Sequence, residues 1–323
     1  KVDFTTGTIP GNLIRFSIPL MAGNLLQQLY NIADTLIVGR FIGKEALAAV
    51  GASFPVVFLA VALAAGLSMG CNVVISQLFG ANRIREMKVT ISTALLGQFF
   101  LSLAIMIAGG LLSPAILRLL KSPANIMADS RTYLQIYFCG AVFLFIYNTL
   151  NGIYNALGDS KTPLYFLMFS TLANIALDLL FVIRYQMGVA GVAWATLIAQ
   201  GICAGLSFLI LLIRLKKLPD EEDAPELNAR LFDFSAVKRI ARVGVPSMIQ
   251  QSIVSFSMLL MQGLVNSYGA LFIAGYTAAT KIDSLAMLPN MNFSNAMSSY
   301  TAQNIGAGKQ ERVREGYKAS LFM

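Results

Sequence analysis

The chain has 323 residues, of which 56% are apolar, only 12% are charged and none is histidine. Soluble proteins have about 45–50% apolar and about 25% charged residues, so this composition excludes most soluble enzyme classes and indicates a protein of the lipid bilayer. The absence of histidine excludes Ser-His-Asp catalysis, imidazole proton relays and His-ligated zinc or haem. The three scattered cysteines predict neither a disulfide nor a metal site. The net charge of +8 fits basic loops of a membrane protein, so no nucleic-acid partner is expected.

Eight apolar stretches are each long enough to cross about 30 Å of hydrocarbon, which takes about 20 helical residues. They do not alternate apolar and polar residues, as the strands of a membrane β-barrel would. The predicted helices cover 14–39, 47–79, 89–112, 132–157, 164–185, 190–213, 243–268 and 271–304, and a ninth begins at Tyr317. We therefore expect an all-α integral membrane protein, a polytopic helix bundle.

Basic residues are distributed unevenly between the two sets of loops. With a cytoplasmic N-terminus, the inside segments carry 17 Lys and Arg residues and the outside loops carry 6, while Lys281 falls inside a predicted helix. This bias predicts that the N-terminus is cytoplasmic. The polar stretch between the sixth and seventh helices is then a cytoplasmic linker, in which we expect a short amphipathic helix near 226–242.

Two parts of the chain resemble each other at an offset of 226 or 227 residues. The paired segments are 14–28 with 240–254, and SQLFGANRIRE at 76–86 with AQNIGAGKQER at 302–312. Because six helices separate the copies, both have the same orientation, and such a parallel repeat is known in transporters. We expect an N-terminal six-helix lobe, a linker, and the first helices of a truncated second lobe, at 1–213, 214–239 and 240–323 respectively.

Three acidic residues fall inside predicted helices, where an ionisable side chain costs at least about 2.5 kcal/mol to insert and marks a functional candidate. Asp34 continues a polar stripe at helical spacing, formed by Asn24, Gln27, Gln28 and Asn31, which must face protein or water. Asp178 follows Asn174 by one turn, so an amide and a carboxylate share a face that can bind a proton or Na⁺.

Two other charged features are less informative. Asp283 follows Lys281 by two residues, so their side chains point to different sides of a helix, and both mutual neutralisation through other helices and a functional role stay open. The sequence GDSKTP at 158–163 lacks the spacing of a phosphate-binding loop. It predicts a cytoplasmic turn between the fourth and fifth helices.

Several segments together are typical of one transporter family, namely IPLMAGNLLQQLYNIADTLIVGRFIG, the QLFGA and QNIGAG helix ends, SPAILRLLKSP, NALGDSKTP, GVAGVAWATLIAQ and GYTAATKID. Through these segments the chain resembles the multidrug and toxic compound extrusion (MATE) transporters of bacteria. The resemblance implies twelve helices in two six-helix lobes, alternating access about a central cavity, and a truncated chain. It also implies a monomer in the bacterial inner membrane that exports drugs or organic cations in exchange for H⁺ or Na⁺, with no enzymatic activity and no organic cofactor.

The resemblance also implies which residues form the cation site of the first lobe. That site, for H⁺ or Na⁺, consists of Asp34, Asn174, Asp178 and Thr196, and Tyr133 and Asn148 match polar positions in the same cavity. The seventh helix departs from the pattern of some Na⁺-driven members. It carries Gln250 and Gln251 where those members have a Glu, which weakens the case for a second cation site there.

Other functions are less well supported by the residues. A flippase for lipid-linked oligosaccharide precursors is the nearest alternative, but it favours a basic cavity for a pyrophosphate, and the first six helices contain acids and almost no basic residue. A membrane enzyme needs a cluster of catalytic groups at the membrane face, and none is visible in the sequence. A passive channel would conduct without coupling.

Overall fold

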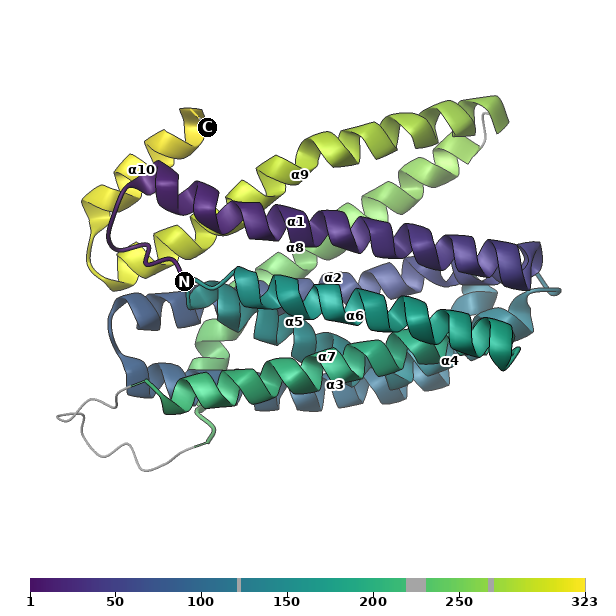
Figure 1. Ribbon diagram of the computed structural model, residues 1–323, viewed down its shortest axis with the longest axis horizontal. Helices are drawn as coiled ribbons and strands as arrows, with labels where there is room; N and C mark the ends of the chain where they lie inside the picture. The colour runs from purple at the N-terminus through teal and green to yellow at the C-terminus, as the bar shows by residue number, and fades with distance from the viewer. Residues whose placement is uncertain (121–122, 219–230, 267–269, 323) are drawn as a thin grey trace.

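The computed structural model describes residues 1–120, 123–218, 231–266 and 270–322, and these are almost entirely helical, with no strand. The elements in chain order are α1 (Ile9–Ile37), the π-helix η1 (Val38–Ile42), α2 (Lys44–Gly80), α3 (Ile84–Leu119), α4 (Met127–Cys139), α5 (Ala141–Ala156), α6 (Lys161–Leu179), the π-helix η2 (Leu180–Arg184), α7 (Gly188–Lys216), α8 (Phe234–Asn266), α9 (Ala270–Gly306) and α10 (Gln310–Phe322). This is the helical membrane bundle expected from the sequence (Figure 1).

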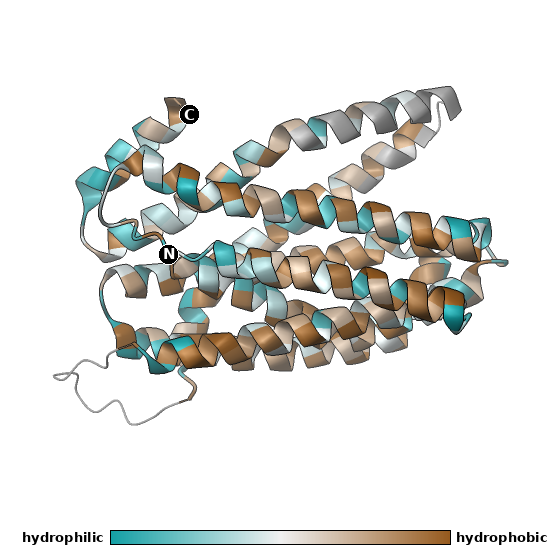
Figure 2. Cartoon of the chain, viewed as in Figure 1, coloured by the Kyte–Doolittle hydropathy of each residue, from teal (hydrophilic) through white to brown (hydrophobic). Residues whose placement is uncertain are grey.

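The predicted fourth span is broken. It consists of α4 and α5, which meet at Gly140 with a bend of 49°. A Cβ at Gly140 would lie 3.2 Å from Leu197 Cγ, so the absence of a side chain lets the bend approach α7. Among the described residues, four helices are long and apolar enough to cross a membrane, namely α2, α3, α7 and α6 with η2, and the bent pair counts as a fifth. Hydrophilic residues gather at the two ends of the bundle (Figure 2).

The helices α8 and α9 form a second group that meets the first seven at one end of the bundle. We call this the N-terminal end, because it holds residues 1–8 together with the turns 81–83, 157–160 and 307–309 (Figure 1). The helix α8 packs along α2, and α9 packs against α1 and α2. Toward the opposite end α9 diverges from α1 (Figure 1). The two groups are therefore in contact at the N-terminal end, and α9 and α1 lie farther apart at the other (Figure 1).

The two copies of the predicted repeat motif contact each other at the N-terminal end. A Cβ added to Gly80 of α2 would lie 2.0 Å from the Gln303 carbonyl oxygen, and one added to Gly306 of α9 would lie 1.9 Å from the Gln77 carbonyl oxygen. Each motif thus supplies a glycine on which the backbone of the other rests. The helices α1 and α8 also run in the same direction (Figure 1), as a parallel repeat requires. The division into lobes at 1–213, 214–239 and 240–323 stays a prediction.

The expected amphipathic helix near 226–242 is not a separate helix in the structure. Residues 226–230 lie outside the described residues, 231–233 are not helical, and 234–242 form the first turns of α8. The start of α8 is instead tied to α3, because Ser92 Oγ donates to the Leu231 carbonyl (2.7 Å) and the Asp233 N–H donates to Thr93 Oγ1 (2.9 Å). From these anchors one helix continues from Phe234 to Asn266, with Pro246 inside it.

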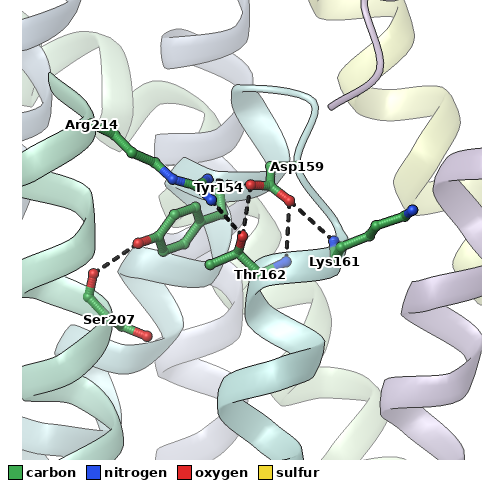
Figure 3. Close-up of polar contacts among 6 residues, drawn as sticks. All are labelled: Tyr154, Asp159, Lys161, Thr162, Ser207 and Arg214. Atoms are coloured by element: carbon green, nitrogen blue, oxygen red, sulfur yellow. Dashed lines mark hydrogen bonds and ion pairs between the residues drawn. The ribbon is translucent and has the colours of Figure 1, made fainter. Parts of the chain in front are cut away.

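The turn between α5 and α6 is held by Asp159 (Figure 3). Its carboxylate caps α6, accepting hydrogen bonds from the backbone N–H groups of Lys161 (3.2 Å) and Thr162 (3.1 Å). It also forms an ion pair with Arg214 of α7, whose guanidinium lies 5.4 Å from the centre of the Tyr154 ring. Burial raises the pKa of Asp159, but the bonds from Arg214 and Thr162 outweigh burial and hold the pKa below its usual range. The predicted turn is therefore a structural junction of three helices.

Replacing Asp159 with Asn should destabilise the full-length protein by about 2 kcal/mol at neutral pH, because the partly buried Arg214 loses its counter-charge. The folded-state pKa of Asp159 is depressed. The stability that its carboxylate contributes is therefore fully present above the unfolded-state pKa and is lost as the pH falls through the folded-state pKa. The unfolding midpoints of wild type and variant in detergent should therefore converge below about pH 4. Asp129→Asn, at an exposed position of α4, is the matched control. Equal midpoints at neutral pH would contradict this role.

Candidate functional site

The carboxyl groups of Asp34 and Asp178 lie together inside the bundle. The helix α1 packs along α6, and each of the two carboxyl groups interacts electrostatically with the other. Asp178 is fully buried. Within the described ranges, neither oxygen of Asp178 nor Oδ1 of Asp34 has a hydrogen-bond partner of good geometry. An unpaired buried charge costs several kcal/mol, so this pair is suited to hold a proton or a small cation.

Polar side chains from three helices surround this carboxyl pair. Asn174 lies one turn before Asp178 on α6, and its Nδ2 donates to Thr196 Oγ1 of α7 (3.3 Å). The Tyr30 hydroxyl of α1 also bonds to Thr196 Oγ1 (3.2 Å). The buried Asn174 Oδ1 has no hydrogen-bond partner among the described residues. Carboxylate, amide and hydroxyl oxygens are the ligands that hard cations prefer, so Asn174, Asp178 and Thr196 can serve a cation as well as a proton.

The two remaining predicted site residues differ in where they lie. Tyr133 of α4 is buried, its ring stacks on that of Tyr137 (6.3 Å between centroids), and it interacts electrostatically with both Asp34 and Asp178. Asn148 of α5 donates from Nδ2 to the carbonyl of Leu144 in its own helix (2.8 Å). In the described part of the chain, Asn148 makes no bond to the carboxyl pair. The structure therefore brings together five of the six predicted residues, namely Asp34, Tyr133, Asn174, Asp178 and Thr196.

Two features of the site were missed in the sequence. Tyr30 lies one turn before Asp34, on the same helix face, and an aromatic residue beside a polar stripe was the available signal. The second feature is that both acid-bearing helices end in π-helices, η1 four residues after Asp34 and η2 two residues after Asp178. The two π-helices contact each other. Wide turns of this kind are frequent at functional sites, and apolar residues such as VGRFI and LFVIR do not encode them visibly.

Asp283 is exposed on α9, and the side chain of Lys281 lies outside the described residues. In the part of the chain that the structure describes, no Lys or Arg forms an ion pair with Asp34 or Asp178. The carboxyl pair therefore sits in an acidic environment that favours cations over anions.

The comparisons with known proteins agree with this architecture. A family model described as MatE matches residues 19–180 and 246–323, which is most of the chain. The chain belongs to the MatE family. It is 36% identical over 311 residues to the probable multidrug resistance protein YpnP of Bacillus subtilis, covering 96% of this chain and 68% of that relative. It is 30% identical over 312 residues to the probable multidrug resistance protein YoeA of the same organism, covering 95% and 67%.

Solved structures of MATE transporters have the same fold as this chain. The outward-facing conformation of a multidrug resistance MATE family transporter superposes with a TM-score of 0.87 at 26% identity, covering 99% of this chain and 71% of that one. A transporter of the MOP superfamily from Pyrococcus furiosus, described as having a binding pocket of reverse polarity, gives a TM-score of 0.88 at 26% identity, covering 99% and 71%. This MatE protein is thus a multi-pass transporter of the bacterial plasma membrane, and it is not an enzyme. The comparisons do not favour a flippase.

Proposed function

We propose that the protein is a cation-coupled antiporter that exports drugs or organic cations by alternating access between two lobes. The observation that carries the proposal is the pair of half-buried Asp34 and fully buried Asp178, in which Asp34 Oδ1 and both Asp178 oxygens have no hydrogen-bond partner of good geometry in the described part of the chain. Family membership supports a small-molecule drug as the substrate, since the relatives YpnP and YoeA are named as probable multidrug resistance proteins.

Coupling follows from competition for the same two carboxylates. A proton or Na⁺ bound at Asp34 and Asp178 neutralises the pair and removes the attraction for a cationic substrate, so the substrate leaves. The substrate displaces the ion in turn, because binding couplings between two ligands are reciprocal. Asn174 and Thr196 supply further oxygens if the ion is Na⁺. The chain requires no organic cofactor in this scheme and acts as a monomer.

The direction of opening follows from the charge distribution. With a cytoplasmic N-terminus, the N-terminal end, where the two helix groups are in contact, faces the cytoplasm, and the end where α9 diverges from α1 faces outward. The flippase alternative would require a cavity that attracts a pyrophosphate, which the acidic pair disfavours.

Purified full-length protein in proteoliposomes tests the proposal. An imposed pH or Na⁺ gradient should drive accumulation of a fluorescent organic cation against its own gradient, and collapse of the ion gradient with an ionophore should stop the accumulation. Substrate movement that ignores the imposed gradients would identify a channel or an uncoupled carrier. Movement of an anionic lipid-linked sugar instead of the cation would favour the flippase.

A further inference from the structure

The N-terminal segment, residues 2–7, lies between the two helix groups at the N-terminal end (Figure 1). On one side it is joined to the first group. The Val2 N–H donates to the Gly158 carbonyl in the α5–α6 turn (2.7 Å), and a Cβ at Gly158 would lie 1.9 Å from the Val2 carbonyl oxygen. Gly158 also has a φ of +71°, so this turn depends on glycine for both its shape and its contact with Val2. The segment is thus attached to the first group at Val2.

On its other side the same segment is held by α9 and α10. Arg312 Nη2 lies 3.2 Å from each of the carbonyl oxygens of Phe4, Thr6 and Gly7, and Lys309 Nζ donates to the Thr5 carbonyl (2.9 Å). These bonds end on backbone carbonyls of the segment. They break if α9 and α10 move away from the first group.

The side chain of Phe4 and the amide of Gln303 close the core of this contact. The Phe4 ring is fully buried and packs edge-on against Phe16 of α1 (5.0 Å) and Tyr300 of α9 (5.8 Å). Gln303, also fully buried, accepts from the Phe4 N–H at Oε1 (3.3 Å) and donates from Nε2 to the Ala156 carbonyl at the end of α5 (2.7 Å). One amide therefore joins the segment, α5 and α9.

We propose that residues 2–7, held by Gln303 and Arg312, form a latch that keeps the N-terminal end closed and is released when that end opens. The inference rests on the proposed alternating access. Opening exchanges each of these bonds for a bond to water, so each contributes only modestly, which suits a contact that must form and break in every cycle. Asn24 Nδ2 of α1, which donates to Asn292 Oδ1 of α9 (3.0 Å), extends the same closed contact deeper into the bundle.

Distance measurements between spin labels test the latch without any substrate. The native cysteines of the full-length protein, including Cys71, Cys139 and Cys203, are replaced by Ser, and labels are placed at Asn82 and Glu311, exposed positions of the two groups at the N-terminal end. Arg312→Ala and Gln303→Ala should each raise the ratio of long to short label distances about fivefold, the loss of about one net hydrogen bond. Arg314→Ala removes the same charge from an exposed neighbour and should leave the ratio unchanged. Ratios in Arg312→Ala and Gln303→Ala that equal the ratio in the protein without these substitutions would overturn the latch, and so would an equal rise in Arg314→Ala.

A reversible tether tests the same contact by transport. In the full-length protein with Thr5→Cys and Lys309→Cys, a short cleavable thiol crosslinker should reduce substrate export at least tenfold, and reduction of the linker should restore it. Each single-cysteine variant should export at the same rate before and after treatment with the crosslinker. Undiminished export by the tethered protein would overturn the latch, whereas absence of export before tethering and in the single variants would count against the proposed transport function itself.

Discussion

Cells that produce full-length Asp34→Asn should export a cationic drug at least tenfold more slowly than cells with the wild-type protein. The substitution keeps the size of the side chain but removes the ionisable group that interacts with Asp178 across α1 and α6. Without it the site can neither attract the cation nor exchange it for a coupling ion. The measurement is the rate of fluorescent drug efflux from loaded cells, normalised to the amount of transporter in the membrane.

The matched control is Asp129→Asn, which removes a carboxylate from an exposed position of α4. It should retain wild-type efflux and membrane abundance. Normal efflux by Asp34→Asn at equal abundance would refute the assigned role of the carboxyl pair, while equal loss in both variants would point to a general effect of removing negative charge.

Asp178→Asn should abolish coupled export and leave the protein as stable as wild type or more stable. Asp178 is fully buried, and neither of its oxygens has a hydrogen-bond partner of good geometry among the described residues, so ionising this carboxyl group carries a desolvation cost. An amide of the same shape avoids that cost, on the order of 1–3 kcal/mol. Such opposite effects on stability and activity are typical of residues kept for function.

Thermal unfolding in detergent and efflux in cells, measured on the same Asp178→Asn preparation, test this pairing of effects. An unfolding midpoint well below that of the wild type would show that Asp178 supports the fold. Retained export would show that Asp34 alone is sufficient for coupling.

The arrangement of helices could be predicted from the sequence because a bilayer allows few solutions. Length and hydropathy place helices in the chain, and the repeat of QLFGA in QNIGAG predicted two copies that the structure brings into reciprocal contact at Gly80 and Gly306. The acid pair was also accessible, since an unpaired carboxylate in an apolar helix has few structural explanations. Helical spacing alone put Asn174 and Asp178 on one face.

What could not be predicted depends on contacts between distant parts of the chain. The latch joins Phe4 to Gln303 and Arg312, about 300 residues away, and its bonds involve backbone carbonyls that have no sequence signature. The break at Gly140 lies against Leu197 of α7, a contact that only the folded bundle reveals. Asn148 matched a polar position of the family, but its amide is used inside its own helix.

Gradient-driven accumulation in proteoliposomes, compared between wild type and the two carboxyl variants, tests the central claim most directly. Wild type and Asp129→Asn should accumulate a cationic drug only while a pH or Na⁺ gradient is present, and Asp34→Asn and Asp178→Asn should not accumulate it under either gradient. Gradient-dependent accumulation that survives in both carboxyl variants would contradict the claim that Asp34 and Asp178 couple the ion to the substrate.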